Sequence, residues 1–228
     1  MRKSIATLAG LLALAAAAGQ ARAATVSQTL GTVVQVGGGP VASGDVFASS
    51  AFAGSADPAP FDLFNGLDGS GPDFSAGFTF NYAAPGGPVD SGLLVLGLYD
   101  GDTAAPGDQL ALFTLNGIDL TSSLNAVFEA TPSSNSQEVF YSLVLPSAVY
   151  SQLATGAVTI GLDLKGPGLG VLGQTAHNGA VLDFATLTVG SRDTGPSPTP
   201  EPAAWGLMIL GFGLAGAGLR RGAALRGV

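Results

Sequence analysis

The sequence predicts an all-β domain over residues 24–192, an antiparallel β-sandwich of the jelly-roll type, with an N-terminal signal helix before it and a C-terminal transmembrane helix after it. Short apolar runs separated by Gly, Pro, Asn, Asp and Ser are typical of sandwiches and barrels. In several runs apolar and polar residues alternate, which is the period of a half-buried strand. Strands and helices do not alternate along the chain, and this disfavours a parallel α/β fold.

Each expected strand is one of these apolar runs. They are Ser27–Val36, Val46–Phe52, Phe74–Tyr82, Leu93–Tyr99, Gln109–Leu115, Ala126–Ala130, Val139–Leu145, Val158–Leu164 and Val181–Val189. In 74–80 and 158–164 the larger apolar residues occupy every second position, so one face of each strand should enter the core. Residues 37–40 predict a turn between strands, and only one short helix is expected, between Pro146 and Gly156.

The N-terminus has the pattern of a secretory signal peptide over residues 1–23. Arg2 and Lys3 precede an apolar run over 5–18, and Ala21-Arg22-Ala23 provides small residues at the positions that signal peptidase reads. Cleavage after Ala23 would leave Ala24 as the first residue of the mature protein. The apolar run is shorter than the ~20 residues that span a bilayer, although an uncleaved N-terminal anchor stays open as an alternative.

The C-terminus has the composition of a linker followed by a membrane anchor. Residues 193–199 form a Pro-rich linker, whose alternating prolines favour an extended spacer. Residues 203–219 contain no charge and predict a transmembrane helix, with Trp205 near its start. Basic residues beyond an apolar run stay in the cytoplasm, so Arg220, Arg221 and Arg226 place the domain outside it.

The arrangement of this tail resembles the PEP-CTERM sorting signal, in its variant with Trp after the Pro-Glu-Pro motif. The resemblance covers residues 200–226: Pro200, Glu201 and Pro202, then Trp205, then Met208 to Leu214, and the basic tail of Arg220, Arg221 and Arg226. It implies an exported protein of a Gram-negative bacterium, sorted and processed by a membrane exosortase and often associated with extracellular polysaccharide or biofilm. The basic cluster is interrupted by Gly222, Ala223 and Ala224. An ordinary single-span anchor is the alternative.

The charge distribution excludes some classes of partner. Every acidic residue except Glu201 lies between residues 45 and 193, whereas Lys165 and Arg192 are the only basic side chains in that part of the chain. Nucleic acid binds through Lys and Arg, so it is excluded as a partner, and so is anionic lipid for this domain. The chain has no Cys, which excludes disulfides and thiolate metal sites.

Residues typical of catalysis are scarce, and the protein is expected not to be an enzyme, with no catalytic residues. His177 is the single histidine, and no Gly-x-Ser-x-Gly elbow accompanies it. His177 and Lys165 are both expected in solvated turns. Most Asp residues adjoin Gly or Pro, where turns place them, but the number of carboxylates leaves an acid–base pair of the glycosidase type open.

No cofactor is expected, with structural calcium as the open alternative. Calcium takes six to eight oxygen ligands, and two stretches are rich in oxygen donors. The candidate ligands are Asp62, Asp68, Asp73, Asp100 and Asp102. Neither stretch fits the EF-hand loop, and the same residues are also explained as turn formers.

Three functional hypotheses follow from the sequence. The first is a non-catalytic structural or interaction protein, anchored in the inner membrane as a precursor and then placed at the cell surface or in the extracellular matrix. The second is a carbohydrate-binding module that uses exposed aromatic residues such as Tyr82, Tyr99 or Tyr141. The order of segments 96–100, 146–160 and 182–189 resembles exported carbohydrate-binding jelly rolls. The third is a carboxylate-based polysaccharide-active enzyme.

Overall fold

The computed structural model describes residues 24–192, 206 and 208–212. The predicted signal peptide 1–23, the linker 193–199 and most of the sorting signal lie outside these residues. Gly206 and residues 208–212, which belong to the expected transmembrane segment, are helical. Among the described residues, no helix has the length and apolar character needed to cross a membrane. The described residues 24–192 form one compact unit.

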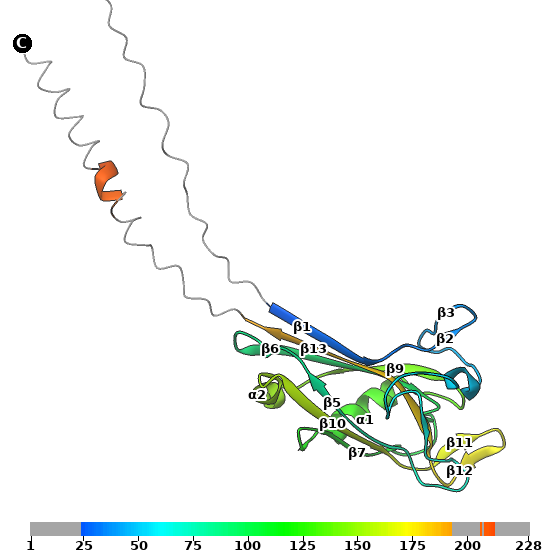
Figure 1. The fold of residues 1–228 in the computed structure, drawn as a ribbon. Helices are drawn as coiled ribbons and strands as arrows, with labels where there is room; N and C mark the ends of the chain where they lie inside the picture. Colours follow the sequence, from blue (N-terminus) through cyan, green and yellow to red (C-terminus); the bar gives the residue numbers. More distant parts are fainter. Residues whose placement is uncertain (1–23, 193–205, 207, 213–228) are drawn as a thin grey trace, which may run out of the picture. The chain divides into compact units, whose positions relative to one another are not determined.

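A five-stranded antiparallel sheet forms one layer of this unit (Figure 1). Its strand order is β1-β13-β6-β9, and β4 pairs with the start of β13, before the stretch that pairs with β1. The strands are β1 (Ala24–Gly31), β4 (Phe64–Asn65), β6 (Val89–Tyr99), β9 (Glu138–Val144) and β13 (Ala180–Ser191). The first and last strands are therefore neighbours, and Ala24 lies opposite Ser191.

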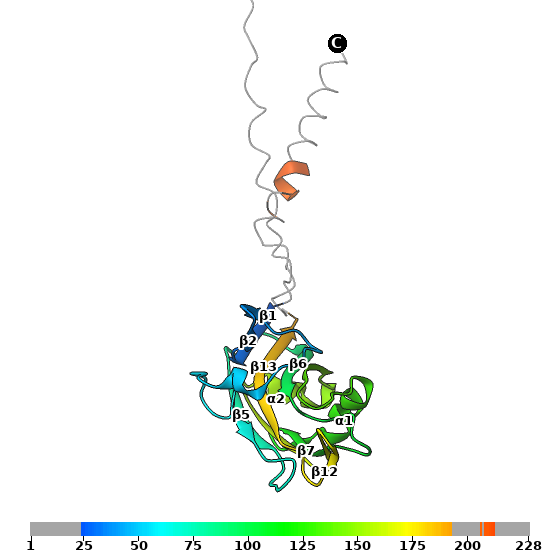
Figure 2. The same cartoon turned by 90° about the vertical axis from the view of Figure 1, so that its right-hand side faces the viewer.

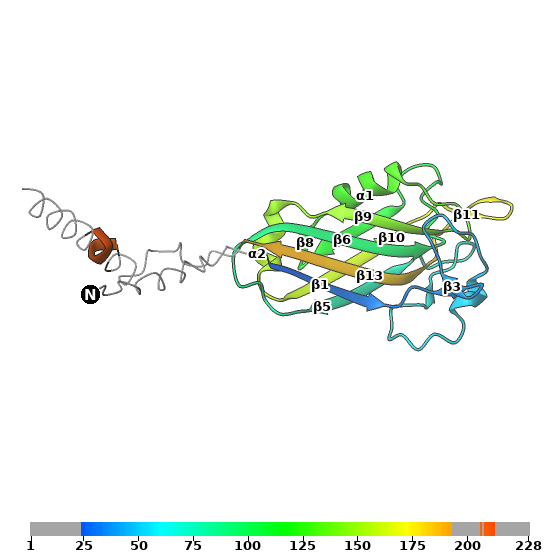
Figure 3. The same cartoon turned by 90° about the horizontal axis from the view of Figure 1, so that it is seen from above.

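A four-stranded antiparallel sheet forms the second layer, in the order β5-β10-β7-β8. Figure 3, seen from above, shows β5 and β10 running beneath the first sheet. Its strands are β5 (Ser75–Asn81), β7 (Leu110–Leu115), β8 (Ile118–Asp119) and β10 (Ala157–Leu164). Two small hairpins complete the β structure. They are β2 (Gln35–Val36) with β3 (Gly39–Pro40), and β11 (Gly168–Gly170) with β12 (Gly173–Thr175).

One hydrophobic core takes side chains from both sheets. Phe78 and Phe80 of β5 belong to the same buried cluster as Leu94 and Leu96 of β6. Alternate residues of β5 are buried and exposed, as predicted from the period of two in this segment. The expectation of an all-β, antiparallel domain is confirmed, and the predicted strands in 74–82, 93–99, 109–115, 139–145, 158–164 and 181–189 are all present within a few residues.

The longest helix, α1 (Thr121–Ala130), was not expected, and the prediction of a strand over 126–130 is wrong. Leu124 and Phe128 are four residues apart, so they lie on one face of the helix and both are buried. The carboxylate of Asp119 accepts a hydrogen bond from Thr121 N at 2.8 Å, which satisfies one of the free amides at the start of the helix. The helix packs against β7 and β9 and so closes one side of the core between the sheets.

Two other segments contain short helices, of which one was predicted and one was not. The predicted helix after Pro146 is confirmed as a 3-10 turn, η2 (Ser147–Val149), followed by α2 (Tyr150–Leu153). The strand predicted over 46–52 is wrong, because η1 (Ser49–Phe52) occupies its end and only Val46 forms an isolated bridge. Figure 2 gives the end-on view in which α1 and α2 lie on the same side of β13.

The segment containing η1 packs on the outer face of the five-stranded sheet. Here Val34, Val41 and Phe52 form a second small core with Tyr99 of β6 and Val181 of β13. This layer buries part of the sheet that would otherwise face water, and several carboxylates lie within or beside it.

Candidate functional site

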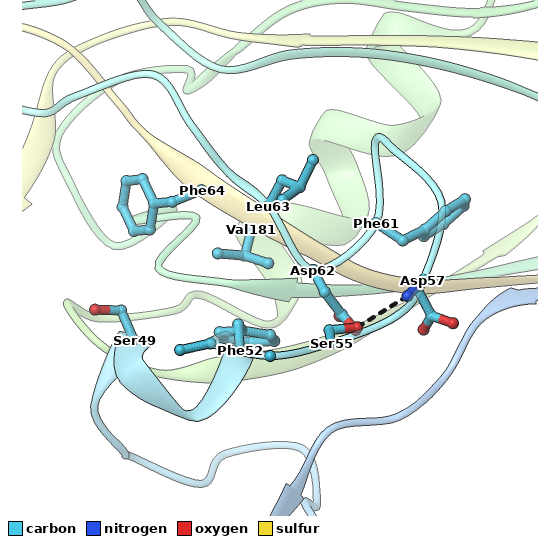
Figure 4. Close-up of a pocket in the computed structure, with 11 residues that line it drawn as sticks. Ser49, Phe52, Ser55, Asp57, Phe61, Asp62, Leu63, Phe64 and Val181 are labelled. Carbon is cyan, nitrogen blue, oxygen red and sulfur yellow. Dashed lines mark hydrogen bonds between the residues drawn. The ribbon is translucent and has the colours of Figure 1, made fainter.

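A pocket of about 300 Å³ opens between η1, the segment 53–57 and the segment 61–64, against β13 (Figure 4). Its walls combine aromatic rings with oxygen-bearing side chains. The lining residues are Ser49, Phe52, Ala53, Gly54, Ser55, Asp57, Phe61, Asp62, Leu63, Phe64 and Val181. Pockets that orient small molecules have this mixture of apolar surface and a few polar groups.

Asp62 is the most constrained polar residue of the pocket. Its carboxylate accepts a hydrogen bond from the Ser55 hydroxyl, and Figure 4 shows these two side chains pointing toward one another. Its backbone has a φ of 57°, in the left-handed region, and its amide donates to Leu182 O at 2.9 Å. The other carboxylate oxygen has no partner although the residue is only 7% exposed. Burial raises the pKa of Asp62.

Asp62 belongs to a group that we call the Asp62 cluster, comprising Asp57, Asp62, Glu138 and Asp183. Asp183 accepts hydrogen bonds from Val34 N at 3.0 and 3.3 Å. Burial and the neighbouring Asp62 raise the pKa of Asp183, because two carboxylates so close together cannot both ionise easily. The sequence singled out Asp62 alone as a candidate ligand, since Asp57 adjoins Pro58 as a turn former and the other two members come from distant segments.

Glu138 is a fully buried member of the Asp62 cluster. It is 0% exposed, and neither carboxylate oxygen has a hydrogen-bond partner. Burial, and then the charges of Asp183 and Asp62, raise the pKa of Glu138 to about 9. The two ion pairs found among the described residues, His177 with Asp73 and Arg192 with Asp90, involve no member of this cluster. Glu138 is therefore held as the neutral acid at pH 7.

The other four predicted calcium ligands lie in a different part of the domain. Asp68 and Asp73 are in the loop before β5, and Asp100 and Asp102 follow β6. All four contact the loops around β11 and β12 or the turn before β9. Their hydrogen bonds are Asp68 to Gly179 N (2.6 Å), Asp73 to Asn178 N (2.8 Å), Asp100 to Ser136 N (2.5 Å) and Asp102 to Leu169 N (2.5 Å).

Three of these carboxylates and one amide form what we call the Asp102 cluster: Asp68, Asp100, Asp102 and Asn178. Burial is the main cause that raises the pKa of Asp100 to about 6 and that of Asp102 to about 8. Burial also raises the pKa of Asp68. Within the described part of the chain, no three His, Cys, Asp or Glu side chains are grouped so that they alone could hold a metal ion.

The tyrosines expected as exposed sugar-binding residues are not exposed, so this part of the carbohydrate hypothesis is wrong. Tyr99 and Tyr141 are 1% and 0% exposed. The Tyr99 hydroxyl donates to Phe47 O at 2.7 Å, and that of Tyr141 lies 3.0 Å from the Thr103 hydroxyl. Tyr82 is half-buried and donates to Leu153 O at 2.6 Å. Strand alternation placed these rings in the two cores, where their apolar bodies are buried.

The two residues considered for catalysis show no catalytic arrangement of their own. The His177 ring is partly exposed, with Nδ1 at 3.6 Å from a carboxylate oxygen of Asp73. Lys165 is exposed, at the end of β10. The expectation that the protein is not an enzyme stays a prediction.

The residues of the predicted end signals lie outside the described structure, except that Ala24 is the first residue of β1. Those outside it are Ala21, Ala23, Pro200, Glu201, Pro202, Trp205, Arg220, Arg221 and Arg226. For this tail the evidence is comparative. A family model for the PEP-CTERM protein-sorting motif matches residues 198–222. Comparisons with curated proteins and with solved structures gave no match.

The matched residues contain the Pro-Glu-Pro motif, Trp205 and the first two arginines of the basic tail. The motif implies an exported precursor that passes through the membrane and is processed by an exosortase. The chain thus carries a PEP-CTERM protein-sorting motif at its C-terminus, as the sequence predicted.

Proposed function

We propose that this protein is a non-catalytic structural or interaction component of the cell surface or extracellular matrix, delivered there by exosortase sorting. The observation that supports the proposal is the PEP-CTERM motif at residues 198–222, which follows a domain with a predicted N-terminal secretion signal. An association with biofilm or exopolysaccharide is part of the proposal.

The ends of the folded domain are compatible with processing on both sides. Ala24 is the first residue of β1, so signal cleavage after Ala23 would remove no residue of the strand. At the other end β13 finishes at Ser191, seven residues before the matched motif begins at residue 198. Cleavage at either site would leave the pairing between β1 and β13 whole. We interpret the two sheets on one core as the jelly-roll-like sandwich expected from the sequence.

Fractionation of the native host tests the sorting step. The triple substitution of Pro200, Glu201 and Pro202 by alanine should retain the protein in the membrane fraction as an unprocessed species, because the exosortase signal is lost. The matched control is Pro196→Ala, which changes a proline of the linker outside the matched residues. The proposal fails if the triple variant is distributed between membrane, surface and medium as the wild type is.

A second candidate function is glycan binding. The binding site would be the pocket and not the tyrosines expected from the sequence, which are buried. Phe52, Phe61 and Phe64 line it together with Ser55 and two carboxylates, and Phe64 is 42% exposed. Sugars bind through stacking of their apolar faces on aromatic rings and through hydrogen bonds from their hydroxyls to such acceptors.

Calorimetric titration with exopolysaccharide fragments distinguishes this candidate from a purely structural role. Phe64→Ala should weaken binding about tenfold or more, whereas Leu172→Ala, which removes an exposed apolar side chain from the β11–β12 hairpin, should not. Absence of binding by the wild type would exclude the candidate. Turnover of the polysaccharide that is lost in Asp62→Asn would favour the carboxylate-based enzyme instead.

A further inference from the structure

Two buried oxygen atoms of the Asp102 cluster have no hydrogen-bond partner. One is Oδ1 of Asp102 and the other is Oδ1 of Asn178. Both residues are 0% exposed. A buried polar atom without a partner costs on the order of 1–3 kcal/mol, and more when it is charged. Two of them close together are therefore candidate ligands for a bound cation.

The two atoms belong to the same small region. Asn178 Nδ2 donates to the backbone oxygen of Gly101 at 3.0 Å, and Gly101 directly precedes Asp102. Because that partner is a carbonyl, the amide nitrogen must face it, and this fixes which end of the Asn178 side chain is the oxygen. The free amide oxygen is thus beside the Asp100–Asp102 turn. When Asp102 is ionised both unsatisfied atoms are acceptors, so neither can satisfy the other.

Two further carboxylates are nearby. Asp100 and Asp68 are close enough for their charges to act on Asp102. Both Asp100 and Asp102 adopt left-handed backbone conformations, with φ of 61° and 51°. The β11 segment approaches closely at Gly168, where a Cβ would lie 3.0 Å from Asp102 Oδ2. Among the described residues, neither ion pair contains a member of the Asp102 cluster.

We propose that the Asp102 cluster binds a calcium ion, with Oδ1 of Asp102 and Oδ1 of Asn178 as ligands. The nearby carboxylates of Asp100 and Asp68 would add negative charge that attracts the ion. Calcium takes carboxylate, amide and carbonyl oxygens together with water, in a flexible geometry. The donors here are all oxygens, which disfavours zinc. The carboxylates alone form no metal-binding group, so the proposed site needs the amide oxygen and water as further ligands.

The ion would join loops that are far apart in the sequence. Asp68 precedes β5, Asp102 follows β6, and Asn178 lies between β12 and β13. The loops are already attached to one another by hydrogen bonds, such as Gly179 N to Asp68 and Leu169 N to Asp102. Calcium would replace the mutual repulsion of the carboxylates by attraction to one centre. The domain would then be more stable in a calcium-rich exterior than inside the cell.

Thermal unfolding of the full chain in mild detergent tests the proposal, after treatment with EGTA and then with 10 mM calcium or 10 mM magnesium. For the ~0.1–1 mM affinity of extracellular calcium modules, calcium should raise Tm by roughly 3–10 °C. Magnesium should raise it much less, because it needs a stricter octahedral geometry. Calorimetric titration of the wild type should give one site per chain, a readout that does not depend on any variant folding.

Matched variants locate the site. Asp102→Asn and Asn178→Ala should each weaken calcium binding at least tenfold, whereas Asp108→Asn, an exposed carboxylate in the same loop, should leave it unchanged. If the wild type binds no calcium and its Tm is the same in calcium and EGTA, the proposal is wrong, and a proton on Asp102 is the occupant. Equal shifts in calcium and magnesium, or equal loss of binding in Asp108→Asn, would also overturn it.

Discussion

Glu138 should make the domain less stable as the pH rises, and replacement by glutamine should remove that part of the pH dependence. The pKa of this carboxyl rises from its ordinary 4.5 to about 9 on folding, mainly through burial. A raised pKa means that the folded state holds a proton that the unfolded chain releases. The corresponding stability is present below pH 4.5 and is lost as the pH rises toward about 9.

The magnitude follows from 1.36 kcal/mol for each pH unit between the two pKa values. At pH 7 the unfolded carboxyl is ionised while the folded one keeps its proton, which costs about 3 kcal/mol relative to pH 4.5. Glu138→Gln keeps the shape without an ionisable proton. The free energy of unfolding of this variant should therefore exceed that of the wild type by up to about 3 kcal/mol at pH 7, and the difference should shrink toward pH 4.5.

Urea denaturation at pH 5, 6, 7 and 8 measures this difference. The matched control is Glu129→Gln, the same substitution at an exposed position of α1, which should give the pH dependence of the wild type. Asp62 and Asp183 also titrate with raised pKa values, so some pH dependence should remain in Glu138→Gln. The reasoning is refuted if the wild type and Glu138→Gln lose stability with identical slopes between pH 5 and pH 8.

Two further substitutions test the packing. Leu124→Ala in α1 should lower the free energy of unfolding by about 2–5 kcal/mol, because its side chain is fully buried, and the exposed Ser122→Ala should change it by less than about 0.5. An equal effect of both would mean that α1 does not close the core. Gly97→Ala should cost about 1–3 kcal/mol in the same urea assay, since its Cβ would lie 2.5 Å from the Phe184 ring. Gly69→Ala, which meets no atom within 4 Å, is its control, and a neutral Gly97→Ala would contradict the close approach.

The strands could be predicted because each has its own local signal. In β5 and β10 the period of two is uninterrupted, and a buried face follows directly from it. In α1 the segment 126–130 was interpreted by itself as an apolar run. The helical period appears only when Leu120, Leu124 and Phe128 are taken together, and these three are all buried.

The candidate sites could be predicted only in part. The Asp-rich stretches around residues 68 and 100 were recognised as oxygen-rich loops, and the fold brings them together at Asn178. Asp62 was assigned to the same group but lies in the Asp62 cluster. Glu138 and Asp183 sit at or within strands, where a single acidic residue gives no signal of a pairing. Such groupings depend on strand order, which short apolar runs do not determine.

The central claim is two-ended processing of an exported precursor, and intact mass of the protein recovered from its native host tests it most directly. Membrane and culture-medium fractions would be compared. The account predicts a species that begins at Ala24 and ends near residues 200–202, outside the membrane or with a new modification at its C-terminus. A species that keeps residues 203–228 and is confined to the membrane fraction would contradict it, and the tail would then be an anchor only.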